Sequence, residues 1–204
     1  MKIARGVEAS DWTNLNLSSP DSPDWPLAIS VFERRIRERF VEAAEFLIAD
    51  DEKRPAVERR FGFAILTVNC LLIETLEAFR RGLTDTRSRS KELCTSFLTS
   101  RPAFKQFFND ALAERFYEEF RCGIAHHAQV FGSGRIWSLG PMLRLDGEQI
   151  TVNRTAFHFG VLQELDGYLM ELHDQNSTQL RQNFRDKMDF VAEGKYQRTR
   201  SRIT

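Results

Sequence analysis

Cysteine and histidine are scarce in this chain of 204 residues, which contains three cysteines and four histidines. Cys70, Cys94 and Cys122 are odd in number and far apart, so they form neither a CxxC pair nor a disulfide framework. No group of Cys and His residues has the spacing of zinc ligands. We therefore expect free thiols, no metal site and no cofactor.

Long apolar runs and a net charge are also lacking. No stretch reaches the roughly 18 uninterrupted apolar residues of a membrane span, and the opening MKIARGVEASDW has no apolar signal-peptide core. We expect a soluble protein of the cytosol with no membrane contact. Basic and acidic residues balance at 29 each, so any contact with RNA depends on local clusters of Lys and Arg.

The composition that remains, 42% hydrophobic and 28% charged residues, is that of one folded globular domain. Residues 1–27 should be an irregular lead-in, because Ser, Asp, Asn and Pro favour turns there, with Trp12 and Trp25 pinning it to the core. Residues 28–173 should form the helical domain. Residues 174–204 should be a polar, helical tail whose last ten residues carry basic side chains and no acid.

Apolar residues recur at spacings of three and four in several segments, which is typical of amphipathic helices. Helices are predicted over residues 28–49, 55–82, about 87–98 with Thr86 as cap, from Ser100 onward, 110–130 and 155–173. The second is apolar on nearly every side and contains Glu74. A carboxylate in such a setting needs a cation, a hydrogen-bond donor or a proton, since an unpaired buried charge costs several kcal/mol.

Residues 135–153 break this pattern by alternating apolar and polar side chains around Asp146-Gly147. Asp-Gly supplies the positive φ angles of a tight hairpin turn. The predicted fold class is therefore mainly α, an antiparallel helical bundle with a small β-hairpin insertion near residues 135–153. His158 and His173, on the last helix of the bundle, are interpreted as packing or surface residues.

The segment with the most specific chemistry is FYEEFRCGIAHHAQ, in which Arg121 precedes His126 by five residues and His127 by six. This spacing resembles the Arg-x(4–6)-His signature of the HEPN superfamily, helical-bundle proteins that include many ribonucleases of toxin–antitoxin and antiviral systems. The resemblance implies a homodimer in which two motifs face one cleft, and Glu74 or Asn69 as the polar residue that supports the arginine. Cys122 departs from the polar residue that many active members have after the arginine.

The same residues suit RNA cleavage on chemical grounds alone. Attack by the 2′-OH of RNA needs a base, an acid for the leaving oxygen and a cation for the phosphate, and no metal. Histidine titrates near neutrality, and arginine grips phosphate through two N–H groups. We therefore expect Arg121 to bind the phosphate and His126 to transfer protons, with His127 as the competing choice.

Geometry leaves alternatives open, because Arg121 and His126 stand roughly 140° apart on an ideal helix. Either Gly123 loosens the turn, the arginine side chain wraps around the helix, or the functional pair forms between two subunits. In a purely structural alternative, Arg121 neutralises Glu74 and His126 is a hydrogen-bonded core residue.

The leading hypothesis is a dimeric, metal-independent endoribonuclease with RNA as substrate and an antitoxin or another protein as partner. The second hypothesis is a non-catalytic, HEPN-like dimeric module that binds a nucleotide or a protein.

Overall fold

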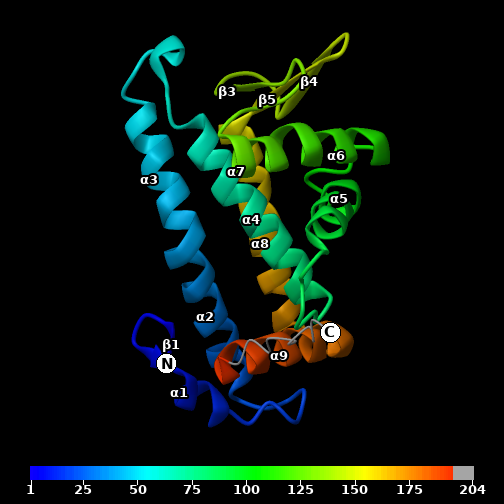
Figure 1. Cartoon of the computed structure of the whole chain (residues 1–204). Coiled ribbons are helices and arrows are strands. Elements are labelled where there is room, and N and C mark those ends of the chain that lie inside the picture. The colour runs from blue at the N-terminus through cyan, green and yellow to red at the C-terminus, as the bar shows by residue number, and fades with distance from the viewer. Residues whose placement is uncertain (195–204) are drawn as a thin grey trace, which may run out of the picture.

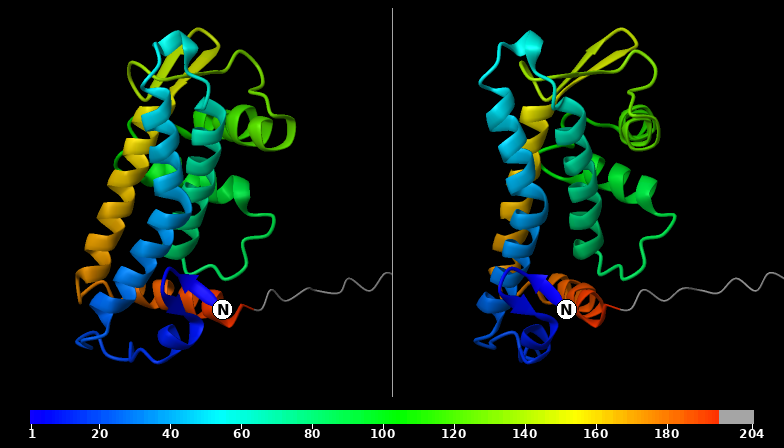
Figure 2. Two further views of the ribbon diagram at one scale, coloured as in Figure 1. Left: turned by 90° about the vertical axis from the view of Figure 1, so that its left-hand side faces the viewer. Right: turned by 60° about the vertical axis from the view of Figure 1, so that its left-hand side comes forward.

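The computed structural model describes residues 1–194, which are mainly helical. Three long helical segments run side by side (Figures 1 and 2). The first comprises α2 (Trp25–Ile36), the π-helical η1 (Arg37–Val41) and α3 (Glu42–Asp51); the others are α4 (Gly62–Arg80) and α8 (Arg154–His173). The first segment runs opposite to α4, whereas α4 and α8 run in the same direction, so only part of the bundle is antiparallel (Figure 1).

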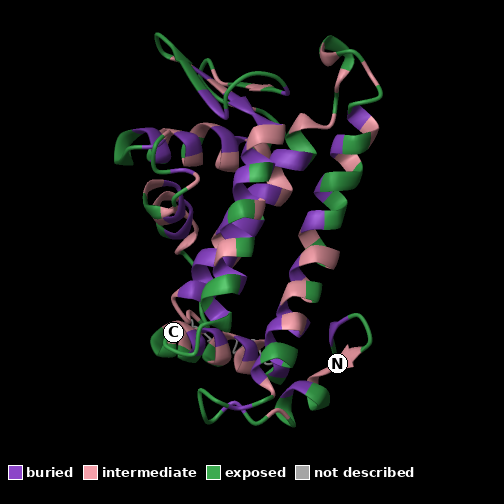
Figure 3. Ribbon diagram, turned by 180° about the vertical axis from the view of Figure 1, so that it is seen from behind, coloured by how far each residue is buried: buried purple, intermediate pink, exposed green. Residues whose placement is uncertain are grey.

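Helix α4 is the central helix, as its all-round apolar sequence predicts. It packs against α8 on one side and α5 (Ser90–Ser100) on another. Within the described chain it is the one helix long and apolar enough to cross a membrane, yet 56% of its most apolar 18-residue window is buried. Such burial is typical of a core helix in a soluble protein, and Figure 3 shows buried residues along the long helices.

A small sheet covers one end of the long helices (Figure 1). It contains β3 (Arg135–Trp137), β4 (Leu143–Asp146) and β5 (Gln149–Asn153) in the order β3-β5-β4. Strands β4 and β5 form the predicted hairpin, and Gly147 at its turn has a φ of 57°. The parallel pairing of β3 with β5 was not predicted.

The N-terminal residues form regular structure, so the prediction of an irregular segment over residues 1–27 is wrong for its first half. A two-stranded hairpin of β1 (Lys2–Ala4) and β2 (Val7–Glu8) leads into α1 (Ala9–Thr13). The Trp12 and Trp25 side chains are buried, as predicted, and both contact the ring of Phe184.

Phe184 belongs to α9 (Thr178–Glu193), which lies across the end of the bundle that also carries α1 (Figure 1). Residues 174–193 therefore belong to the folded body and are not a tail. Phe184 and Met188 are fully buried, and Leu180, Val191 and Ala192 pack with them against the core, so this face anchors a helix of largely polar sequence. The basic residues predicted for the last ten positions, 195–204, lie outside the described part of the chain.

Three predicted helix starts are wrong, the first because a carboxylate accepts backbone N–H groups that the predicted helix would use. Asp51 accepts the N–H groups of Arg60 and Phe61, so a turn with a short 3-10 helix, η2 (Ala56–Glu58), precedes α4. Glu164 accepts the N–H of Ala103, and residues 101–107 form turns. In the third case the N-cap position of α5 is Arg89, not Thr86.

Candidate functional site

The predicted site residues Arg121, His126 and His127 lie on one helix that changes its hydrogen-bonding pattern. It consists of α6 (Asp110–Phe116), the π-helical η3 (Tyr117–Cys122) and α7 (Gly123–His127). The side chain of Asn109 caps its start by accepting the N–H of Leu112. Arg121 lies within the π-helical segment, a rare form of helix that is frequent at functional sites.

Arg121 forms a two-pronged ion pair with Glu74 of α4. Its Nε lies 2.7 Å from Oε1 of Glu74, and its Nη2 lies 3.3 Å from Oε2. Ser90 of α5 also donates a hydrogen bond to Oε2, at 2.9 Å. Glu74, whose apolar surroundings predicted a need for a partner, therefore has a cation and a hydroxyl donor. The pair joins the motif helix to α4 and α5.

The guanidinium of Arg121 remains charged, and not all of its N–H groups form hydrogen bonds. Burial alone would lower the pKa of Arg121, but hydrogen bonds to Glu74 and its negative charge raise the pKa overall. Within residues 1–194 the Nη1 nitrogen has no hydrogen-bond partner, and it is not among the fully buried side-chain atoms that lack one. Nη1 therefore keeps some solvent exposure in a side chain that is 15% exposed, and its two N–H groups have no partner in these residues.

The pocket that adjoins Arg121 in the described residues is small. It has a volume of about 20 Å³ and lies between the guanidinium, Ile124, Ala125 and three residues of α4. This volume suits about one water molecule. A larger ligand must therefore approach Arg121 from the surface.

His126 and His127 occupy the C-terminal end of the same helix and are exposed. Neither has a hydrogen-bond partner in the described residues, and neither is bonded to Arg121. The ring of His127 packs against Phe131, with centroids 4.9 Å apart. The structural alternative is therefore wrong for His126, whereas its pairing of Arg121 with Glu74 is confirmed.

Gly123 shapes this end of the helix by allowing a close approach of the chain. Ala128 adopts a left-handed conformation with a φ of 52°, and the chain then folds back over the helix. A Cβ atom on Gly123 would lie 2.4 Å from the backbone oxygen of Gln129. Gly123 thus makes room for the returning chain.

Asn69, the other predicted supporting residue, does not reach Arg121. Its Oδ1 lies 2.9 Å from Nδ1 of His158 on α8, and its Nδ2 donates to the carbonyl of Ile65. Both side chains of this Asn69–His158 pair are buried. Burial lowers the pKa of His158 to about 4, so the ring is neutral at pH 7. His158 is a packing residue, in line with its interpretation from the sequence.

A surface groove that the sequence did not predict begins two residues after His127. It has a volume of about 840 Å³ and is lined by Gln129, residues of the β3–β4 region and Phe63 of α4. Arg135 and Arg144 lie at this groove, and neither side chain forms an ion pair or hydrogen bond within residues 1–194. Trp137 also lines it, 41% exposed. The one feature of the sequence that could have indicated this groove is the alternating pattern of the strands, which turns these side chains outward.

No protein-family model, no curated protein and no solved structure matches this chain. The likeness of the Arg121–His126 spacing to the HEPN signature therefore stays a prediction. Within the described residues, no three His, Cys, Asp or Glu side chains gather in a position to hold a metal ion. Arg121, the two histidines and the groove beside them are the elements from which a function can be argued.

Proposed function

We propose that this protein is a metal-independent endoribonuclease of HEPN type that cuts single-stranded RNA as a homodimer. The observation that carries the proposal is the state of three side chains on one helix. Arg121 is held charged by Glu74 with Nη1 partly exposed to solvent, and His126 and His127 are exposed without a partner in the described chain. Exposed groups of this kind on a fixed helix are available to a substrate.

In the proposed reaction, one histidine takes the proton of the 2′-OH, whose oxygen attacks the adjacent phosphorus. The bond from phosphorus to the 5′-oxygen breaks, and an imidazolium gives that oxygen a proton. Arg121 stabilises the negative charge that builds on the phosphate through Nη1. The products are a 2′,3′-cyclic phosphate and a free 5′-OH. We assign the proton transfer to His126 and a lesser role to His127, whose ring packs on Phe131.

The groove beside the histidines has the chemistry of a single-strand binding surface. Such surfaces combine cations that follow the phosphates with aromatic rings on which bases stack, at about 1–3 kcal/mol per base. Arg135 and Arg144 supply unpaired cations, and Trp137 and Phe63 supply exposed rings. A chain with no net charge can bind RNA in this way, because the affinity would come from the local charges of one surface.

The proposed dimer accounts for the separation of Arg121 from His126 within one copy. Arg121 is directed at α4, whereas His126 is exposed at the helix end, so within one copy they do not meet. A site in which Arg121 of one copy faces His126 of the other would bring them together. Enzymes of this type act in the cytosol in toxin–antitoxin or antiviral systems, and we propose the same setting, with an antitoxin as protein partner.

The test is cleavage of single-stranded RNA in EDTA, with the ends identified by mass spectrometry. Wild-type protein should leave 2′,3′-cyclic phosphates, and a DNA strand or a strand with one 2′-deoxy position at the cut site should stay whole there. Arg121→Ala and His126→Ala should each abolish cleavage, and His127→Ala should reduce it less. His173→Ala is the matched control, because it removes an exposed histidine at the end of α8.

A mixture of inactive Arg121→Ala and His126→Ala proteins tests the composite site. Exchange of subunits should restore part of the activity, because some dimers then contain one intact site. Arg135→Gln and Arg144→Gln should raise KM and weaken the salt dependence of binding without a matching loss of kcat. If wild-type protein cuts no RNA, or both motif variants keep full activity, the enzymatic proposal is wrong and the non-catalytic binding module becomes the better account.

A further inference from the structure

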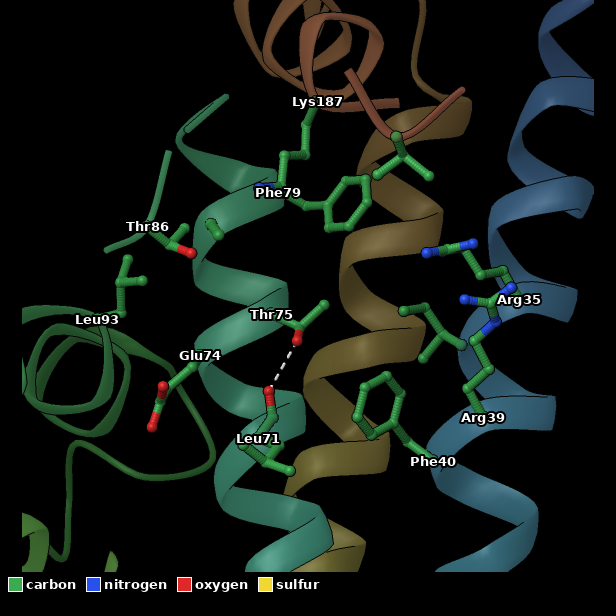
Figure 4. Close-up of a pocket in the computed structure, with 13 residues that line it drawn as sticks. Arg35, Arg39, Phe40, Leu71, Glu74, Thr75, Phe79, Thr86, Leu93 and Lys187 are labelled. Carbon is green, nitrogen blue, oxygen red and sulfur yellow. Dashed lines mark hydrogen bonds between the residues drawn. The ribbon is translucent and has the colours of Figure 1, made fainter. Parts of the chain in front are cut away.

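A second basic pocket lies away from the histidines, between α2–η1, α4 and α9. Its volume is about 360 Å³. Figure 4 shows Arg35 and Arg39 reaching into it from α2–η1 and Lys187 reaching in from α9 above Phe79. Three cationic side chains from two segments, α2–η1 and α9, thus line one pocket, although the chain as a whole has no net charge.

None of these three cations forms an ion pair in the described chain, although the charge of Asp85 acts on Lys187. Nη1 of Arg35 and Nη2 of Arg39 both donate to the backbone carbonyl of Ile3, at 2.6 and 3.2 Å. Nζ of Lys187 lies 3.4 Å from the carbonyl of Thr84. Most other arginines of the long helices pair with carboxylates, as Arg37 does with Glu33 and Asp166. One carbonyl shared by two guanidiniums leaves most of their N–H donors unused.

The carboxylate that also lines the pocket does not neutralise them. Glu74 contacts the pocket, but both of its oxygens are occupied by Arg121 and Ser90. Burial and the nearby charge of Arg39 lower the pKa of Arg35 to about 10. Burial likewise lowers the pKa of Lys187. Both shifts mean that keeping these side chains charged costs free energy, and a bound anion would offset that cost.

The rest of the lining is apolar. Phe40, Leu71 and Phe79 contribute to the wall between the cations, together with Ala78. The volume lies at the lower end of the range for small-molecule sites, about 300–1,000 Å³. A simple inorganic anion would use the cations and leave this wall without a contact. The lining therefore fits a molecule with an anionic group and a compact apolar body.

We propose that this pocket binds a phosphate monoester that carries a compact aromatic or apolar group. The phosphate would lie against Arg35 and Arg39, since guanidinium groups bind phosphate oxygens through paired N–H donors. The apolar group would contact Phe40, Leu71 and Phe79, with Lys187 at the rim. Glu74 connects this pocket to Arg121, but Arg121, His126 and His127 do not line it, and its occupancy is measurable in protein that has no cleavage activity.

The experiment is isothermal titration calorimetry of the full chain with phenyl phosphate as the probe. Inorganic phosphate and benzyl alcohol serve as probes that lack the ring or the charge. Phenyl phosphate should bind saturably and at least tenfold more tightly than either, and its affinity should fall as salt rises. Arg35→Gln and Arg39→Gln should each weaken binding at least tenfold, and Lys187→Gln by less.

Arg34→Gln is the matched control. Arg34 is the neighbour of Arg35, and it too donates to a backbone carbonyl of the N-terminal hairpin, that of Arg5. It does not line the pocket, so its loss should leave the affinity unchanged. If Arg35→Gln unfolds the N-terminal hairpin, Arg39→Gln and Lys187→Gln still decide the outcome. Absence of saturable binding, an equal loss in Arg34→Gln, or equal affinities for phenyl phosphate and inorganic phosphate would overturn the proposal.

Discussion

Two of the arginine–carboxylate pairs that join distant parts of the described chain differ in how far they are shielded from solvent. Asp51 and Arg154 connect α3 to α8, with Nη2 3.0 Å from Oδ2 and the side chains 0% and 1% exposed. Asp51 also accepts the backbone N–H groups of Arg60 and Phe61. Burial alone would raise the pKa of Asp51, but these hydrogen bonds and the charge of Arg154 lower it overall.

Arg121 and Glu74 form the open counterpart. Their side chains are 15% and 13% exposed, and Nη1 of the arginine has no partner in residues 1–194. An arginine that pairs with a carboxylate can therefore still be exposed enough to contact a ligand. What separates the two cases is how far the side chains are exposed to a ligand, and the predictions below test that distinction.

The largest effect is expected where the closed pair is broken. Asp51→Ala leaves Arg154 buried without a counter-charge and two backbone N–H groups without acceptors, so it should lower the free energy of unfolding by about 3–5 kcal/mol. Urea denaturation measures this. Asp50→Ala is the control, because Asp50 pairs with Arg54 at the surface and its loss should cost far less than that of Asp51. Equal effects of the two variants would contradict the closed-pair account.

A second large effect should come from the buried Asn69–His158 pair. The pKa of His158 falls from 6.5 to about 4 on folding, so the unfolded chain binds a proton in this range that the folded chain does not. Stability should therefore decrease as pH falls from about 6.5 to about 4, by roughly 3 kcal/mol from this group. His158→Gln should remove that part of the pH dependence in denaturation curves measured across this window. An unchanged pH profile would show that His158 is not buried neutral.

The sequence predicts the parts of this structure that depend on local pattern. Periodic apolar residues place α8 over residues 154–173, and Asp146-Gly147 places the β4–β5 turn. The all-round apolar character of α4 also predicts that Glu74 needs a cation, which Arg121 provides. Each of these follows from side chains within one segment or from the cost of burying a charge.

What the sequence does not predict depends on contacts between distant residues. The turn before α4 is held by Asp51, and the burial of α9 depends on Phe184 meeting Trp12 and Trp25. The partner of Asn69 is 89 residues away in the chain. Likewise, no single strand predicts the groove beside β3, because its lining comes from α4, the loop after α7 and the sheet.

A smaller effect is expected from filling the space at Gly123. Its Cβ would lie 2.4 Å from the backbone oxygen of Gln129, so Gly123→Ala should displace the chain after His127 and cost about 1–3 kcal/mol. Gly167→Ala on α8 is the control, since nothing lies within 4 Å of its added Cβ. That variant should be neutral or gain up to about 1 kcal/mol. Thermal unfolding compares the two, and a stabilising Gly123→Ala would refute the close approach.

The smallest change in stability is expected at the open pair itself. Glu74→Gln keeps an oxygen that accepts from Arg121 but removes the charge, and solvent can reach the freed donors, so the free energy of unfolding should fall by only about 1 kcal/mol. Glu118→Gln, which removes a carboxylate from the exposed Lys91 pair, is the matched control. The informative readout is the Nε–H signal of Arg121 in NMR spectra, because Glu74 accepts that proton. In Glu74→Gln the signal should shift and exchange faster with water, whereas Glu118→Gln should leave it in place. If Glu74→Gln instead costs as much as Asp51→Ala, the pair is closed in solution, and Arg121 has no donors left for a phosphate.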